Sequence, residues 1–253
     1  MADRPARKNR PTLTLAVRRT EQLSAHLIRV VLGGEDLAKF ADNGFTDKYV
    51  KLQFADNRRT YTVRSFDPEA GELTIDFVYH GDEGLAGPWA ANAKPGDELT
   101  FAGPGGAYAP APEADWHLLV GDESALPAIG AALEAIPAGV PVRAFIQVAN
   151  PAEELKLDTA ADATITWLHR DSGDGDLVGA VRGHEFAPGT VQAFVHGEAG
   201  FVAELRRHLF TERGLPRALV SVSGYWRRGK NEDGWQAEKA ETRRAEEATG
   251  AAR

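Results

Sequence analysis

Cysteine is absent from this chain of 253 residues, and methionine occurs once. Without thiols the protein has no disulfide, no Fe–S cluster held by thiolates and no cysteine nucleophile. No apolar run approaches the ~20 residues that span a bilayer, and the N-terminal sequence lacks the apolar core of a signal peptide. We therefore expect a soluble, cytoplasmic protein without membrane insertion.

Motifs of metal sites and of serine hydrolases are also absent. The seven histidines show no metal-ligand spacing, so we expect no resident metal. No Gly-x-Ser-x-Gly elbow is present, which argues against a Ser-His-Asp hydrolase.

Basic residues are scarce in the middle of the chain. The net charge is −8, and the N-terminal 19 residues hold six Lys or Arg and one acidic residue. Residues 20–225 carry 16 bases against 30 acids, which excludes a nucleic-acid surface there. The basic N-terminal run is most simply a disordered arm.

Strand-forming segments follow one another quickly through the first hundred residues. Six of them, joined by short turns, are typical of a closed antiparallel barrel. Beyond a segment rich in Gly and Pro, apolar strands alternate with helical stretches, which indicates a parallel sheet covered on both faces. The predicted barrel strands are 12–18, 26–32, 49–54, 59–65, 73–79 and 98–101, and the predicted sheet strands are 116–120, 142–148, 164–168, 191–196 and 218–223.

The predicted organisation therefore has four parts. They are a disordered basic arm (1–11), a β-barrel domain (12–111), an α/β domain (112–230) and a helical tail (231–253). The tail is charged and helix-prone, with Trp235 as its apolar contact. We expect a monomer.

The six residues from Arg59 to Arg64, Arg-Thr-Tyr-Thr-Val-Arg, are the most informative segment. Alternate side chains of an extended segment share one face and can meet a planar, phosphate-bearing ligand. Arg59 can form forked hydrogen bonds with a pyrophosphate, Tyr61 can cover an isoalloxazine ring, and the Thr62 hydroxyl can donate to its redox-active edge. These features indicate a flavin site, with an exposed strand bearing solvated arginines as the alternative.

Further segments complete a recognisable series. Because of them the sequence resembles the siderophore-interacting protein family, a branch of the ferredoxin-reductase-like flavoproteins, from about Leu13 to Glu241. The segments are Asp76–Gly81 (DFVYHG), Gly84–Ala90 (GLAGPWA), Pro95–Asp97 (PGD), Gly103–Gly106 (GPGG), Gly121–Ile129 (GDESALPAI) and Gly224–Gly229 (GYWRRG).

The resemblance implies an FAD-dependent reductase of ferric siderophores, with FAD in the barrel. Electrons come from NADPH or NADH or, in one subgroup of the family, from a reduced ferredoxin. Electron transfer through a flavin requires closeness rather than a general acid or base, so no catalytic side chain is expected. Two departures concern phosphate contacts: Ser124 replaces the usual Thr, and residues 84–87 are Gly-Leu-Ala-Gly instead of Gly-Pro-Ala-Ser.

The predicted FAD site draws on several segments. Gly84 to Pro88 opens a helix whose N–H groups suit a diphosphate, with a plain turn as the alternative. His80 either bonds the flavin or caps its strand. Tyr225 or Trp226 either covers the second face of the ring or packs in a core. The predicted FAD residues are Arg59, Tyr61, Thr62, Val78, His80, Gly84, Ala86, Tyr225 and Trp226.

The electron donor is expected after the first strand of the parallel sheet. The turn at Gly121 lacks the three-glycine fingerprint of dinucleotide sites, and its two acidic residues would repel a diphosphate. A simple strand-to-helix turn with Ser124 as N-cap is therefore the alternative. Arg170 is predicted to meet the 2′-phosphate of NADPH, or else is solvated. The predicted NAD(P)H residues are Gly121, Asp122, Glu123, Ser124, Arg170, Gly197 and Glu198.

The substrate is expected at a basic rim formed by Lys48, Lys51, Arg227 and Arg228. Many ferric siderophores are anionic, so such a rim would raise their local concentration, although surface lysines on strands are also common without this role. Two rival functions use similar residues: a carrier that binds flavin and ferric siderophore without turnover, and a general flavin reductase.

Overall fold

The computed structural model describes residues 11–81 and 84–230, together with residues 234, 235, 238, 241 and 244. The chain divides into two compact units: residues 1–109 with 130–132 (unit 1), and residues 110–129 with 133–253 (unit 2). Apart from Pro11, the predicted basic arm lies outside the described residues. The five described residues of the tail are helical, and Trp235 is buried.

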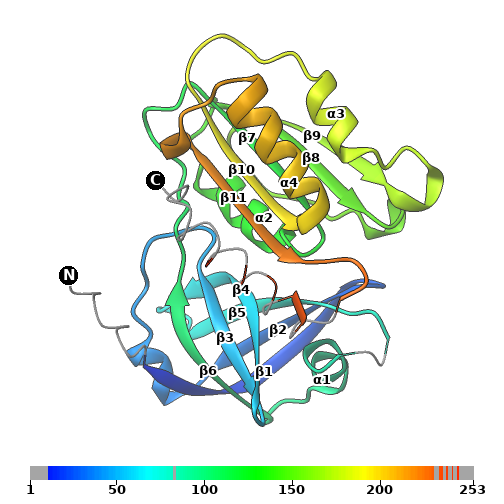
Figure 1. Ribbon diagram of the computed structural model, residues 1–253. Helices are drawn as coiled ribbons and strands as arrows, with labels where there is room; N and C mark the ends of the chain where they lie inside the picture. Colours follow the sequence, from blue (N-terminus) through cyan, green and yellow to red (C-terminus); the bar gives the residue numbers. More distant parts are fainter. Residues whose placement is uncertain are drawn as a thin grey trace. The chain divides into compact units, whose positions relative to one another are not determined.

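Unit 1 is a closed antiparallel barrel in the strand order β1-β2-β5-β4-β3-β6 (Figure 1). Alternation produces its core: in β1, Leu13, Leu15 and Val17 are at most 2% exposed, whereas the residues between them are not buried. The strands are β1 (Thr12–Ser24), β2 (Leu27–Gly33), β3 (Tyr49–Phe54), β4 (Asn57–Asp67), β5 (Glu72–Val78) and β6 (Glu98–Gly105).

Two short helices complete unit 1. A 3-10 helix, η1 (Glu35–Lys39), follows β2, and α1 (Ala86–Asn92) packs beside β2 and β5. Ala86 and Ala90 of α1 belong to the barrel core, with 3% and 1% of their surface exposed. The helix therefore covers part of the apolar interior next to the end of β5.

Unit 2 contains a five-stranded parallel sheet in the order β11-β10-β7-β8-β9. All seven residues of β7 are buried, as expected for a central strand with helices on both faces. The chain order reverses between β7 and β10, and ligands of such sheets bind beyond the carboxyl ends of the strands at this point. The strands are β7 (Trp116–Asp122), β8 (Pro141–Val148), β9 (Asp162–His169), β10 (Val191–Glu198) and β11 (Val220–Trp226).

Three α-helices connect these strands. Helices α3 and α4 pack on β8, β10 and β11 from one face, as Figure 1 shows, and right-handed crossovers place α2 on the other face. The α-helices are α2 (Leu126–Ala135), α3 (Leu177–Gly183) and α4 (Ala199–Arg207). The shorter turns are the 3-10 helices η2 (Pro151–Glu153), η3 (Arg170–Ser172) and η5 (Arg217–Leu219) and the π-helical η4 (His208–Glu212).

The predicted fold class, an antiparallel barrel followed by a parallel α/β sheet, is confirmed. The six barrel strands and five sheet strands occur in the predicted order. The sequence prediction did not include α3, whose seven residues, Leu-Val-Gly-Ala-Val-Arg-Gly, contain two glycines that disfavour a helix. The predicted domain limits stay predictions.

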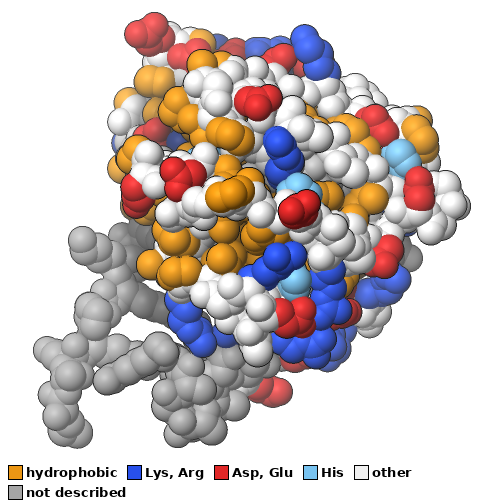
Figure 2. All heavy atoms as spheres, turned by 90° about the horizontal axis from the view of Figure 1, so that it is seen from above, with side chains coloured by type: hydrophobic (Ala, Val, Ile, Leu, Met, Phe, Trp, Pro, Cys, Tyr) orange, Lys and Arg blue, Asp and Glu red, His pale blue; other side chains and the backbone are white. Residues whose placement is uncertain are grey.

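Opposite charges pair on the surface of both units. Arg19 and Glu72 form a forked pair between β1 and β5 in unit 1, and Arg182 contacts Glu212 at 2.6 Å in unit 2. Figure 2 shows one face of the molecule, on which basic and acidic side chains lie beside one another. On that face the charges are therefore mixed rather than separated into fields of one sign.

One ion pair of unit 1 differs from these because its carboxylate is buried. Arg29 of β2 binds Asp76 of β5 through Nε at 2.7 Å and Nη2 at 2.9 Å. The two residues are directly opposite in the β2–β5 register, and the Asp76 side chain is only 3% exposed. Removing the guanidinium would leave a buried carboxylate without its main counter-charge, which is costly.

We predict that Arg29→Met lowers the free energy of unfolding of the barrel by about 3 to 5 kcal/mol, the usual cost of breaking a buried pair. Methionine keeps most of the aliphatic stem, so the change reports mainly on the charge. Arg19→Met is the matched control, because it breaks a β1–β5 pair whose arginine is 59% exposed. Urea denaturation should show a large loss for Arg29→Met and little for the control; equal losses would contradict the prediction.

Candidate functional site

Strand β4 carries the segment that the sequence predicts for a flavin. Its register with β3 places Arg59 opposite Leu52 and Tyr61 opposite Val50, two positions that are 0% exposed. Arg59 and Tyr61 therefore share one face of the strand, and Thr62, which is 8% exposed, projects to the other. The structure thus brings the cation and the ring together but separates the hydroxyl from them.

An aromatic row supports Tyr61. Its ring packs on Phe77 of β5 with 4.6 Å between centroids, and Phe77 contacts Trp89 of α1 at 5.7 Å. Because Tyr61 is only half-buried, part of its ring is available to a planar ligand.

Helix α1 approaches the end of β5 closely because Gly87 has no side chain. A Cβ atom there would lie 3.0 Å from the carbonyl oxygen of Val78. Gly84 precedes the helix with a φ of +83°, a conformation that favours glycine. His80, just after β5, is exposed. These predicted flavin positions therefore gather around one junction between strand and helix.

The groups in unit 1 fit a flavin dinucleotide in kind. They comprise a half-buried guanidinium, an aromatic ring supported from one side, hydroxyls and a glycine turn. The guanidinium of Arg59 donates to the carbonyl oxygen of Arg58 at 3.0 Å, which holds it along β4. These are the groups that pyrophosphate and isoalloxazine binding require.

In unit 2, the carboxylate of Asp122 joins the ends of three strands. Asp122 ends β7 and is 1% exposed. Its Oδ2 accepts hydrogen bonds from the backbone N–H of Glu198 in β10 and from the indole Nε1 of Trp226 in β11, both at 2.8 Å. Its Oδ1 accepts from the backbone N–H of Ser124 at 3.0 Å and from the Ser124 hydroxyl at 2.5 Å. Asp122 therefore braces the switch point from inside and has little surface to offer a ligand.

Burial changes the acidity of this carboxyl group. Loss of hydration, reinforced by the neighbouring Glu123 carboxylate, raises the pKa of Asp122 to about 6, although the four hydrogen bonds favour the charged form. Asp122 therefore binds a proton more readily in the folded chain than in the unfolded chain.

Two glycines allow this close arrangement. A Cβ at Gly121 would lie 2.6 Å from the Cβ of Ala125 and 2.9 Å from the carbonyl oxygen of His196. Gly197 has a φ of +138°, and a Cβ there would lie 2.7 Å from the Asp122 carboxylate. Both predicted donor-site glycines are thus explained by packing between β7, β10 and the helices that follow.

Arg170 lies just after β9 and is already paired. Its Nη1 donates to Oε2 of Glu123 at 2.8 Å, and its Nη2 donates to Oε1 at 2.5 Å. The two side chains are 25% and 14% exposed. Hydrogen bonding to Glu123 raises the pKa of Arg170 against the effect of burial. A 2′-phosphate would have to compete with this forked carboxylate for the guanidinium.

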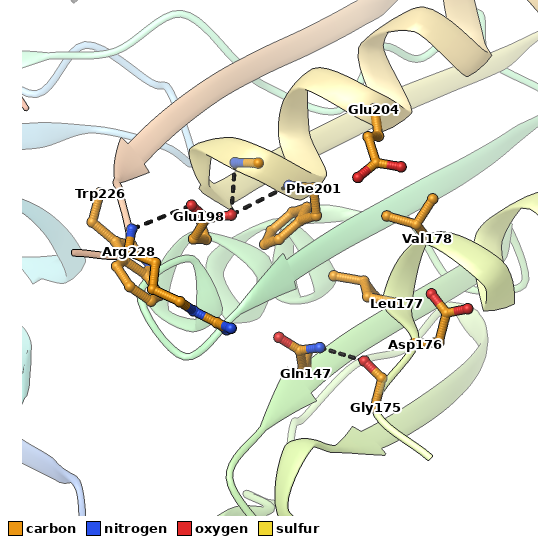
Figure 3. A pocket seen from close by; sticks show the side chains of 11 residues that line it. Gln147, Gly175, Asp176, Leu177, Val178, Glu198, Phe201, Glu204, Trp226 and Arg228 are labelled. Carbon is orange, nitrogen blue, oxygen red and sulfur yellow. Dashed lines mark hydrogen bonds between the residues drawn. The ribbon is translucent and has the colours of Figure 1, made fainter. Parts of the chain in front are cut away.

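A cavity of about 300 Å³ opens at the carboxyl edge of the sheet, entirely within unit 2. It lies between the ends of β8, β10 and β11 and the first turns of α3 and α4 (Figure 3). Three of its lining residues, Glu198, Trp226 and Arg228, are site residues predicted from the sequence. The remaining lining residues are Gln147, Gly175, Asp176, Leu177, Val178, Gly200, Phe201 and Glu204.

Tyr225 and Trp226 have different surroundings at the end of β11. Tyr225 contacts His196 edge to face at 5.1 Å, and His196 stacks on Phe194 at 3.8 Å. Trp226 is held by Asp122 and lines the cavity. Both remain half-buried, so a role for either at the flavin stays a prediction.

The predicted basic rim is divided between the units. In unit 1, Lys48 pairs with Asp42 at 2.7 Å, and Lys51 donates to the Thr60 hydroxyl at 3.0 Å. In unit 2, Arg227 pairs with Glu238 at 3.1 Å. Arg228 instead extends from the end of β11 toward the Gln147 side of the cavity (Figure 3).

Two searches of the described residues bear on metals and membranes. Within ranges 11–81 and 84–230 and the five tail positions, no group of three or more His, Cys, Asp or Glu is arranged to hold a metal ion. No helix in the described part of the chain has the length and apolar character that crossing a membrane requires.

Two family models match the chain. The model described as siderophore-interacting FAD-binding domain matches residues 16–58 and 55–108. The model described as siderophore-interacting protein matches residues 114–229. Together they cover most of units 1 and 2.

Several similar curated proteins align with this chain over nearly their full length. An uncharacterized protein of Mycobacterium tuberculosis is 43% identical, covering 95% of this chain and 99% of the relative. The ferric vibriobactin reductase of Vibrio cholerae is 32% identical, covering 87% and 91%. The NADPH-dependent ferric-chelate reductase of Escherichia coli is also 32% identical, covering 84% and 91%.

Solved structures show the same architecture. The siderophore-interacting protein from Aeromonas hydrophila has a TM-score of 0.82 at 30% identity, covering 92% of this chain and 98% of that one. The ferredoxin reductase in carbazole 1,9a-dioxygenase has a TM-score of 0.67 at 18% identity, covering 85% and 70%. The latter shows that the fold is ferredoxin-reductase-like.

Arg59→Ala is predicted to weaken flavin binding by about 10- to 100-fold, because a charge-assisted hydrogen bond contributes about 1.5 to 3 kcal/mol. The purified variant should stay folded and lose most of its flavin absorbance. Arg58→Ala is the control, since neighbouring side chains of a strand project to opposite faces. Unchanged flavin content in Arg59→Ala would remove Arg59 from the site.

The raised pKa of Asp122 predicts a specific pH dependence of stability. Between about pH 4 and pH 6 the folded state binds the proton and the unfolded state does not, so stability contributed by Asp122 falls as pH rises. Compared with Asp122→Asn, the wild type should therefore lose roughly 1 kcal/mol of unfolding free energy per pH unit in this window. Above pH 7 the difference in unfolding free energy between the two proteins should be constant. Urea denaturation across pH measures this, and a flat difference from pH 4 to 6 would show an ordinary pKa.

Proposed function

The chain belongs to the siderophore-interacting protein family, and from that premise we propose that it is an FAD-dependent reductase of ferric siderophores that uses NAD(P)H. The observation that carries the proposal is the pairing of two sites in one chain. Unit 1 holds the flavin-type donor set on β4, and unit 2 has a cavity of about 300 Å³ at the carboxyl edge of its sheet.

FAD, when bound, supplies the conversion between the two-electron hydride of a nicotinamide and single electrons delivered to Fe(III). The protein's own residues need only bind and orient the reactants. In unit 1, Arg59 would hold the pyrophosphate and Tyr61, supported by Phe77 at 4.6 Å, would support the ring. In unit 2, the cavity would hold the nicotinamide nucleotide.

The iron is substrate in this reaction. Reduction of Fe(III) to Fe(II) weakens its attraction to hard oxygen ligands, so iron can leave the chelate. No acid or base has to act on a bond of the siderophore. The absence of a catalytic side chain in the sequence prediction is consistent with this chemistry.

Of the four predicted rim residues, Lys48, Lys51 and Arg227 are proposed for substrate recognition. Lys51 is better placed than Lys48, since it donates to the Thr60 hydroxyl and forms no ion pair with any described residue, whereas Lys48 is paired with Asp42. An anionic chelate would be attracted by this charge. Arg228 lines the unit 2 cavity, which favours a part in donor binding for this residue.

The finer details of setting belong to the same proposal. We place the reaction in the cytoplasm because NADH and NADPH are cytoplasmic electron donors, and we take the protein as a monomer in which both units of one chain serve one reaction. A reduced ferredoxin is the alternative electron donor.

An anaerobic titration tests the function. We expect the purified protein to carry a flavin spectrum that is bleached by NADH or NADPH and recovers when a ferric siderophore is added. If the protein is yellow but NADH and NADPH do not reduce its flavin, and the chelate does not reoxidise the flavin after chemical reduction, the protein is a carrier. Flavin that exchanges freely with the solution would indicate a general flavin reductase. Bleaching only by reduced ferredoxin would identify that donor.

A further inference from the structure

The cavity of unit 2 has an acidic lining. Three carboxylates face it: Asp176 before α3, Glu198 at the end of β10 and Glu204 on α4, against one guanidinium, that of Arg228 (Figure 3). A cavity of this volume is roughly 8 Å across, no more than the Debye length at physiological salt. An anion inside it therefore lies within about one Debye length of all three carboxylates, close enough to be repelled by each of them.

Backbone groups that usually bind phosphate are already occupied here. Glu198 caps α4 by accepting from the N–H groups of Gly200 at 2.6 Å and Phe201 at 3.3 Å. Asp176 caps α3 by accepting from Gly179 at 2.8 Å. At the turn after β7, Asp122 accepts a hydrogen bond from the backbone N–H of Ser124. Each of these three strand-to-helix connections is thus closed by its own carboxylate, which opposes a phosphate at the helix start.

Most cations near this edge are paired as well. Arg170 is held in a forked pair by Glu123, and Arg227 and Lys230 both bind Glu238, at 3.1 Å and 2.5 Å. Arg228 makes no ion pair with any residue in the described part of the chain; only its backbone N–H is engaged, by Glu198 at 3.3 Å. One cation can serve the diphosphate that both nicotinamide dinucleotides carry, and among the described residues that line the cavity no second cation is present for a further phosphate.

We propose that the unit 2 cavity selects NADH over NADPH, with Asp176 and Glu204 as specificity-determining carboxylates that repel the 2′-phosphate and Arg228 as the contact to the diphosphate. Carboxylates suit the ribose hydroxyls of NADH, whereas the additional phosphate of NADPH requires a basic group. The half-buried rings of Phe201 and Trp226 add apolar surface for a base. The proposal rests on the proposed function for its use of a nicotinamide donor.

The decisive experiment measures binding directly, by calorimetry of NAD⁺ and NADP⁺ with the FAD-loaded protein, and then the rate of flavin reduction by NADH and NADPH. We expect wild-type protein to bind NAD⁺ about tenfold more tightly. In Asp176→Asn/Glu204→Gln, each lost charge should tighten NADP⁺ binding about threefold and change NAD⁺ binding less. Asn keeps the α3 cap.

Two further variants assign the phosphates. Arg228→Gln should weaken both nucleotides equally, because both carry the diphosphate. Glu113→Gln removes the same charge before β7, at the opposite end of the sheet, where Glu113 is exposed, and should leave the ratio of the two affinities unchanged.

Tighter wild-type binding of NADP⁺, or an equal effect of the double variant on both nucleotides, would overturn the proposal. Loss of NADP⁺ binding alone in Arg170→Ala would also overturn it, by placing the 2′-phosphate at Arg170. If neither nucleotide binds, the proposal fails too. Reoxidation of dithionite-reduced protein by ferric citrate then shows independently whether the reductase function stands.

Discussion

The geometry of unit 2 depends on the hydrogen bonds that the buried carboxylate of Asp122 accepts. This carboxylate lies where the strand order reverses, and its Oδ2 ties the end of β7 to the backbone of β10 and to the indole of β11. Its desolvation is costly, but four donors offset much of that cost. The position of Trp226, and with it one wall of the cavity, follows from this single side chain.

The two units use polar groups in different ways. In the barrel, the guanidinium of Arg29 neutralises the buried Asp76 carboxylate. At the sheet edge of unit 2, carboxylates satisfy the backbone of their own turns and one guanidinium. The charged side chains of unit 2 thus mainly shape the site. A ligand must therefore be recognised by the other groups that line the cavity, namely Arg228, two aromatic rings and the carboxylates.

The sequence was sufficient for the architecture because period-two and mixed strand–helix patterns are local signals. It also located Arg59 and Tyr61 on one strand face. It could not predict that Arg170 pairs with Glu123, since Glu123 is 47 residues away in the sequence and the contact depends on the strand order β7-β8-β9. It identified Asp122 as an acidic residue of the turn after β7 but did not show that the residue is buried. Helix α3 was not predicted because its glycines weaken the helical signal, and the cavity that its first turn lines was therefore not predicted either.

Closure of the barrel has a consequence for how the protein behaves at high concentration. Every strand from β1 to β6 has two hydrogen-bonded neighbours, so the described part of unit 1 has no edge strand to which another chain could add one. The sheet of unit 2 does end, at β11 and at β9, and β9 is half-exposed along most of its length, with three threonine or isoleucine residues in succession. Among the described strands, any tendency to self-associate through strand addition is thus confined to the two edges of the unit 2 sheet, at a distance in sequence from β4.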